Sequence, residues 1–215
     1  MRRPPMTTGL DALQRREIAN RGRLLQYLTM LWNSAECAVA LVAGFFAGSI
    51  ALVGFGLDSA IEVTSSAAAL WRLERDSDEG RREAAERRTL QIIGACFLLL
   101  AAYVGYEAAR ALVERRSPDH SPVGIALAVL SLVVMPVLAH FKRRIATRLS
   151  SGALEAETRQ TEVCAWLSVV LLIGLGLNAW VGWWWADPVA ALGMTPLIAW
   201  EGWQGVRGGT CCVVD

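Results

Sequence analysis

Long apolar segments alternate with short charged segments along the chain. Six apolar runs lie at residues 24–46, 50–71, 89–113, 122–141, 156–182 and 188–206. A run of about 20 residues is long enough to cross the hydrocarbon core of a bilayer as a helix. The runs are too long and too continuous for barrel strands, and lipid leaves no partner for exposed backbone polar groups. The pattern predicts an all-α membrane protein, a bundle of six transmembrane helices.

Basic residues gather at one end of the predicted helices. The arginine-rich segments "RLERDSDEGRREAAERR" and "KRRIATRLSSGALEAE" follow the second and fourth runs. With residues 1–23, Arg159 and Arg207, they hold 18 of the 21 Lys and Arg residues. Because basic residues favour the cytoplasmic side, we expect both termini to be cytoplasmic. The predicted organisation is a cytoplasmic tail at 1–23, a transmembrane domain at 24–207 and a short tail at 208–215.

Composition supports a membrane protein and argues against other classes of protein. The sequence is 54% hydrophobic over 215 residues, too apolar for an ordinary soluble domain. Its five cysteines have no secreted spacing pattern, so a disulfide framework is not expected. The N-terminal segment has arginines but no apolar core of its own, which predicts a tail without a cleavable signal peptide. The net charge of +1 does not by itself bear on nucleic acid, and we predict no such partner.

The stretch "GLDSAIEV" places Asp58 and Glu62 inside the otherwise apolar second run. Residues i and i+4 share one face of a helix, so both carboxylates point the same way. If the outer turn lies at Gly48 and Ser49, a rise of 1.5 Å per residue puts Asp58 about 15 Å deep, Glu36 about 18 Å and Glu62 about 21 Å. We therefore expect Glu36, Asp58 and Glu62 at one level near the midplane.

Three carboxylates so close together repel one another unless some are protonated or a cation lies among them. The alternative is that they pair with buried basic residues or stay protonated as hydrogen-bond donors. We expect no basic residue at matching depth. The nearest is Arg159, which should reach the cytoplasmic interface. By contrast, Glu107 has a local partner in Arg110 at i+3. A cation site at the three acids is the simplest interpretation, because intramembrane acids without partners are costly.

The fifth run repeats features of the second. "GSIALVGFGLDSAIEVTSS" and "SSGALEAETRQTEVCAWLS" align without a gap at an offset of 102 residues. Asp58 then corresponds to Gln160 and Glu62 to Cys164. The two helices enter the membrane from opposite sides, as in alternating-access transporters built from inverted repeats. Gln160 and Cys164 either complete a metal site with the acids or are an ordinary buried amide and thiol.

These features together resemble the cation diffusion facilitator family of metal-ion transporters. The likeness runs from Leu24 to Arg207 and is carried by "GSIALVGFGLDSAIEVTSS", by "SGALEAE" before the fifth helix and by "ADPVAAL" at the start of the sixth. It implies a tetrahedral metal site with two acidic or His residues, at i and i+4, from each of the second and fifth helices. Asp58 and Glu62 match the pair on the second helix.

The fifth helix departs from the family pattern. Gln160 stands where the family usually has His, Cys164 where it has Asp, and Glu157 replaces the Asp that precedes this helix. The family commonly continues into a cytoplasmic domain for metal binding and dimerisation, but this sequence stops at "GGTCCVVD". We therefore expect regulation and dimerisation through such a domain to be absent.

The resemblance implies export of a divalent cation across the plasma or bacterial inner membrane in exchange for protons. We expect zinc as the ion, with iron or manganese as alternatives, and a homodimer within the lipid bilayer. The predicted ligands are Glu36, Asp58, Glu62, Gln160 and Cys164. A second hypothesis is a non-transporting membrane protein with a structural or metal-sensing site. An intramembrane enzyme is not expected, because no nucleophile and base pair is visible and His120 and His140 lie away from the acids.

Overall fold

The computed structural model describes residues 12–74, 79–116 and 119–207, and these ranges contain six α-helices and no strand. The helices are α1 (Ala12–Ala47), α2 (Ile50–Glu74), α3 (Glu79–Glu114), α4 (Pro122–Leu149), α5 (Gly152–Val181) and α6 (Ala186–Val206). The predicted all-α fold with six helices is confirmed. The predicted tail at 208–215 lies outside the described residues, and the described part of the predicted tail at 1–23 belongs to α1.

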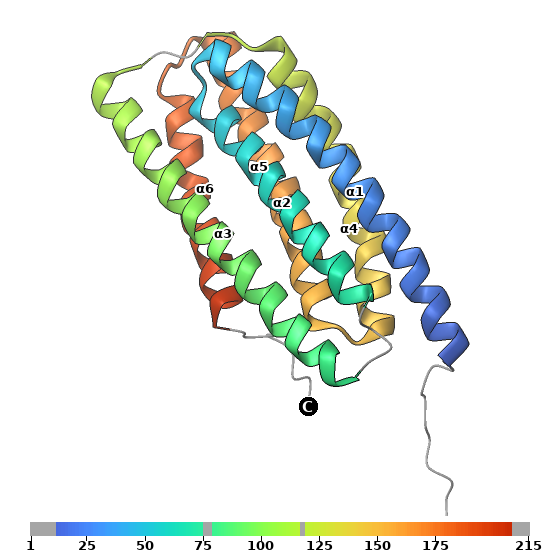
Figure 1. The fold of residues 1–215 in the computed structure, drawn as a ribbon. Helices are drawn as coiled ribbons and strands as arrows, with labels where there is room; N and C mark the ends of the chain where they lie inside the picture. The colour runs from blue at the N-terminus through green and yellow to red at the C-terminus, as the bar shows by residue number, and fades with distance from the viewer. Residues whose placement is uncertain (1–11, 75–78, 117–118, 208–215) are drawn as a thin grey trace, which may run out of the picture.

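The helices form an elongated bundle with α2 and α5 in its middle (Figure 1). On one side of this central pair lie α1 and α4, and on the other lie α3 and α6, which pack closely against each other. The start of α1 and the end of α6 lie at the same end of the bundle, and α2 and α5 run in opposite directions. The opposed direction expected from the sequence echo is therefore present.

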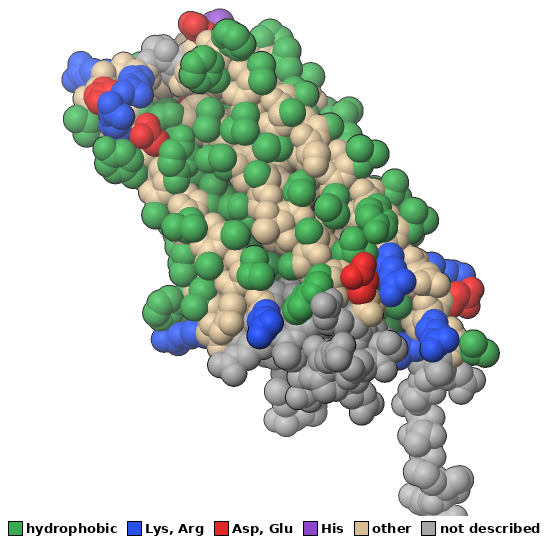
Figure 2. Space-filling view, in the orientation of Figure 1, with side chains coloured by type: hydrophobic (Ala, Val, Ile, Leu, Met, Phe, Trp, Pro, Cys, Tyr) green, Lys and Arg blue, Asp and Glu red, His purple; other side chains and the backbone are tan. Residues whose placement is uncertain are grey.

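Five of the six helices in the described ranges are long and apolar enough to cross a membrane: Leu13–Ala47, Ile50–Trp71, Leu90–Glu114, Pro122–Leu149 and Leu154–Val181. The remaining helix, α6, has 21 residues, a length that matches the roughly 20 residues needed to span. Hydrophobic side chains cover the middle of the visible face, and charged side chains gather at its two ends (Figure 2). Such a surface is that of a multi-pass membrane protein.

A tight turn joins α1 to α2, and a serine N-cap begins both α2 and α5. Gly48 joins α1 to α2 with a φ of +64°, a backbone conformation that suits glycine, so the turn lies at the position used in the depth estimate. At the N-terminus of α2 the Ser49 hydroxyl accepts a hydrogen bond from the Leu52 N–H at 3.1 Å. Ser151 accepts one from the Leu154 N–H at 3.2 Å at the start of α5. The two echoing segments therefore begin with the same N-cap.

The helices extend beyond the apolar runs that predicted them. α4 continues to Leu149 and α5 begins at Gly152, so the segment expected as a loop between them shrinks to Ser150 and Ser151. The apolar run predicts only the part of a helix that lies in hydrocarbon, whereas the helix itself continues into the interface. This correction matters for the site, because it places Lys142 within a helix.

Candidate metal centre

The carboxylates predicted from the second run are buried in the middle of the bundle. Glu36, Asp58 and Glu62 are between 0% and 1% exposed. The Ser59 hydroxyl on α2 donates a hydrogen bond to Glu36 Oε2 on α1 at 3.0 Å. The three acids lie close enough for their charges to act on one another. The tight turn at Gly48 therefore brings the α1 acid beside the α2 pair, as the depth estimate predicted.

Several oxygen atoms of this group lack a hydrogen-bond partner. Both oxygens of Asp58, Oε1 of Glu36 and Oε2 of Glu62 are buried without a donor. Two further polar groups nearby are also unpartnered, the Asn33 amide, one turn before Glu36 on α1, and the Ser131 hydroxyl on α4. Native interiors satisfy most buried polar atoms, so such a concentration calls for a ligand or for protonation.

Helix α5 contributes a thiol and an amide to the same region. Cys164 is fully buried and lies close enough to Asp58 for the two groups to interact. Gln160 is also buried, and both polar atoms of its amide lack a hydrogen-bond partner. Carboxylate oxygens, an amide oxygen and a thiolate are all groups that can bind a divalent ion. The bundle therefore brings both predicted residues of α5 into its buried polar interior.

The expectation that no basic residue lies at the depth of the acids is wrong. Lys142 on α4 is 3% exposed, and its Nζ lies 3.5 Å from Glu62 Oε1. It also donates hydrogen bonds to Glu157 and, at 2.8 Å, to the Thr161 hydroxyl. Because the fourth apolar run ends at residue 141, the sequence pattern assigned Lys142 to a loop, whereas α4 carries it into the interior. Arg159, the expected nearest basic residue, pairs locally with Glu155 at 3.3 Å.

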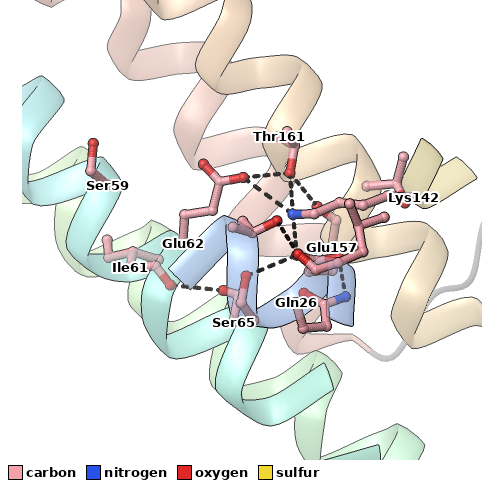
Figure 3. Close-up of polar contacts among 12 residues, drawn as sticks. Gln26, Ser59, Ile61, Glu62, Ser65, Lys142, Glu157 and Thr161 are labelled. Carbon is pink, nitrogen blue, oxygen red and sulfur yellow. Dashed lines mark hydrogen bonds and ion pairs between the residues drawn. The ribbon is translucent and has the colours of Figure 1, made fainter. Parts of the chain in front are cut away.

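Glu157 is the centre of this second polar group. One of its oxygens accepts from Lys142 and from the Ser66 hydroxyl at 3.0 Å. The other accepts from the Gln26 amide at 3.2 Å. Thr161, one turn further along α5, donates to Glu62 (Figure 3). The network joins α1, α2, α4 and α5 directly beside the predicted metal ligands.

The predicted ligands lie in one region but do not surround a common point. Among the described ranges, no group of three or more His, Cys, Asp and Glu side chains is arranged to hold a metal ion. Glu62 is part of the reason, since one of its oxygens is engaged by Thr161 and Lys142. The proposed ligand set therefore stays a prediction, and Oε2 is the Glu62 oxygen that has no partner to give up.

Sequence reasoning missed Asp187, a buried acid at the start of α6. It accepts a hydrogen bond from the Ser49 hydroxyl and further bonds from the backbone N–H groups of Ile50 and Ala51 at 3.0 and 3.2 Å. In the sequence it counted only as part of "ADPVAAL", one of the segments that carry the family resemblance. The available signal was an acidic residue in the first turn of a mostly apolar helix.

The remaining local pair behaves as predicted. Arg110 lies 3.7 Å from Glu107, and it also binds Glu114 at 2.8 Å. These side chains are partly exposed near the end of α3. They pair with one another and do not involve the central acids.

The fold and site together define a multi-pass membrane protein with a carboxylate-lined polar centre between its helices. The family model described as the cation efflux transmembrane domain matches residues 85–208. This match covers more than half of the chain, which therefore belongs to the cation efflux family, a family of metal cation transporters. The resemblance seen in the sequence is confirmed. Membership in a transporter family also agrees with the prediction that the chain is not an enzyme.

Curated relatives extend the similarity across the first helices. The uncharacterized transporter sll1263 of Synechocystis is 28% identical over 197 residues, covering 88% of this chain and 64% of the relative. The cation-efflux pump FieF of Salmonella paratyphi A is 26% identical over 172 residues, covering 75% of this chain and 55% of the pump. FieF of Salmonella typhi is 23% identical over 180 residues, covering 80% of this chain and 60% of the pump. The chain thus spans less than two thirds of each of these relatives.

Proposed function

We propose that this chain exports a divalent metal cation from the cytoplasm by alternating access, in exchange for protons. The observation that carries the proposal is the set of buried oxygens without partners at Glu36, Asp58 and Glu62. Membership in a family of metal cation transporters supports it independently. A divalent cation neutralises adjacent carboxylates and supplies the partner that their oxygens lack.

The mechanism follows from the chemistry of the acids. Facing the cytoplasm, Asp58 and Glu62 bind the ion in their ionised form, with Glu36 as a third carboxylate. Facing outward, the same groups take up protons, which weakens their hold on the ion. Because bound ion and bound protons exclude each other, release of the ion is coupled to uptake of protons. Close packing such as that of Gly44 against Val53, where a Cβ would lie 2.8 Å from a Val53 methyl, lets α1 and α2 move together.

The donor set favours zinc. The Cys164 thiol is a soft ligand that ionises on metal binding, and zinc accepts mixed oxygen and sulfur ligands. The oxygens of Gln160 and of three carboxylates also suit manganese or iron, which remain the alternative cargo. We further propose a homodimer in the cell or inner membrane, with both termini cytoplasmic.

A second candidate function is metal sensing or structural metal binding without transport. The observation that favours it is the ion pair between Lys142 and Glu62, which occupies one of the proposed ligands. The two functions differ in vectorial flux. Both require that the metal bind at Asp58, whereas only a transporter moves it across a bilayer.

Metal analysis of the purified full chain tests the shared requirement. After equilibration with zinc or manganese and desalting, the wild type should retain metal and Asp58→Asn should not. Glu107→Gln serves as the control, because it removes a carboxylate that lies away from the central acids. Equal metal content in all three proteins would rule out a site at Asp58.

A further inference from the structure

Lys142 is an unusual residue in both sequence and position. It is the only lysine among the 21 Lys and Arg residues of the chain. It is nearly fully buried on α4, where its ammonium group reaches Glu157, Thr161 and Glu62 (Figure 3). An ammonium has three N–H donors on a compact charge. The ammonium group of Lys142 therefore places a compact positive charge beside the buried carboxylates and offsets part of their negative charge.

The two carboxylates that share Lys142 hold it unequally. Glu157 binds Lys142 directly and is fixed by hydrogen bonds from Ser66 at 3.0 Å and Gln26 at 3.2 Å. Glu62 lies 3.5 Å from the ammonium and has one oxygen without any partner. Glu157 is therefore the anchor of Lys142, and Glu62 is the partner that can leave at the lower cost.

A metal ion and Lys142 compete for Glu62. An ion bound between Asp58 and Glu62 lies within a few ångströms of the ammonium charge, and charge repulsion is strong in a buried site. Oε1 of Glu62 is held by Lys142 and Thr161, and Oε2 has no partner. The single negative charge of this carboxylate cannot neutralise both cations at close range, so ion binding favours a Glu62 that turns from α4 toward Asp58 while Lys142 stays with Glu157.

We propose that Lys142 is the resident cation of this site. When cargo is absent, the Lys142 ammonium group pairs with the Glu62 carboxylate. This ion pair sets the affinity for the divalent ion, and ion binding releases the contact that it makes between α4 and α2. The inference rests on the proposed function, because it takes Asp58 and Glu62 as the ligands. It adds a residue of α4 as the determinant of how tightly the chain holds its cargo.

The first test removes the anchor pair without changing net charge. In K142M/E157Q the competing ammonium and its counter-ion are both absent, so the full chain should bind zinc or manganese about ten-fold more tightly than the wild type. K142R, which keeps the charge, should retain an affinity close to that of the wild type. Adding D58N to the double variant should abolish the gain.

An unchanged affinity in K142M/E157Q, with binding still lost in D58N, would show that the pair is only structural and overturn the inference. Retention of metal by D58N at the wild-type level would instead overturn the proposed function.

The second test takes its main reading from the wild-type protein and leaves the Lys142 and Glu157 pair intact. Because Lys142 is the only lysine, selective labelling of lysine Nζ with nitrogen-15 gives one side-chain ammonium signal. Saturating zinc should shift this signal in the wild type and leave it unchanged in D58N. A signal that stays in place while the wild type binds zinc would contradict the proposed competition.

Discussion

Asp187 Oδ1 accepts a hydrogen bond of 2.6 Å from the Ser49 hydroxyl, 138 residues away in the chain. Its other oxygen caps two backbone N–H groups at the start of α2. A carboxylate at a helix N-terminus also interacts favourably with the helix dipole. This single side chain of α6 therefore fixes the end of the helix that carries Asp58 and Glu62.

We expect Asp187→Ala to destabilise the protein by about 3 kcal/mol, because it leaves a hydroxyl and two backbone donors without their acceptor. Thermal or denaturant unfolding in detergent, followed by tryptophan fluorescence, measures the loss. Asp187→Asn keeps one acceptor and should lose less. Equal stability of the wild type and Asp187→Ala would show that water or another group replaces the cap.

Removal of a site carboxylate should have the opposite effect on stability. Asp58 has no hydrogen-bond partner in its buried position, so Asp58→Asn removes a costly buried charge. We expect unchanged or higher thermal stability in the absence of metal and loss of the stabilisation that zinc gives the wild type. Melting curves with and without zinc measure both effects. A marked loss of stability without metal would indicate a structural role for Asp58.

The anchor of Lys142 can be tested by a single substitution. Glu157→Gln leaves the buried ammonium with Glu62 as its only carboxylate, and breaking a buried ion pair typically costs about 3–5 kcal/mol. Lys142 should then bind Glu62 more tightly, so zinc affinity should fall, whereas K142M/E157Q raises it. Isothermal titration with zinc measures the affinity of Glu157→Gln and of K142M/E157Q. The prediction fails if Glu157→Gln binds zinc more tightly than the wild type.

The contact between α3 and α6 depends on glycines with no room for a side chain. A Cβ on Gly94 would lie 2.3 Å from the backbone nitrogen of Val206 and 2.7 Å from the carbonyl oxygen of Gly202. We expect Gly94→Ala to destabilise the bundle by about 1–3 kcal/mol or more, because backbone must shift.

Gly176→Ala is the matched control for this substitution. Gly176 also lies within a helix, but a Cβ there meets nothing within 4 Å. Alanine should leave stability unchanged or raise it by up to about 1 kcal/mol, because it has the better helix propensity. Denaturant unfolding of both variants in the same detergent makes the comparison. Equal effects of the two substitutions would contradict the close packing of α3 on α6.

Much of the fold could be predicted from sequence because hydrocarbon imposes simple rules. A run of about 20 apolar residues has to be a helix, and Gly48 marks the turn that sets Glu36 beside the α2 acids. The acids of the two helices meet because the rise per residue is the same in both helices that leave this turn.

Lys142 and Asp187 could not be predicted in the same way. Both lie at the edge of an apolar run, where hydropathy alone does not say whether a charged side chain turns to water or to the interior. The structure resolves this because α4 continues for eight residues past the predicted boundary at 141, to Leu149. A buried charge also needs partners from distant segments, here Glu157 and Ser49, and a single sequence does not reveal them.

Transport by reconstituted protein tests whether the carboxylate at Asp58 carries zinc across a membrane. The full chain is placed in liposomes that contain a zinc-sensitive dye and a pH-sensitive dye, and zinc is added outside. We expect zinc entry coupled to opposite proton movement in the wild type and in Glu107→Gln. In Asp58→Asn both signals should fall to those of protein-free liposomes. Zinc entry at the wild-type rate in Asp58→Asn, or no entry in any reconstituted sample that binds zinc, would contradict this expectation.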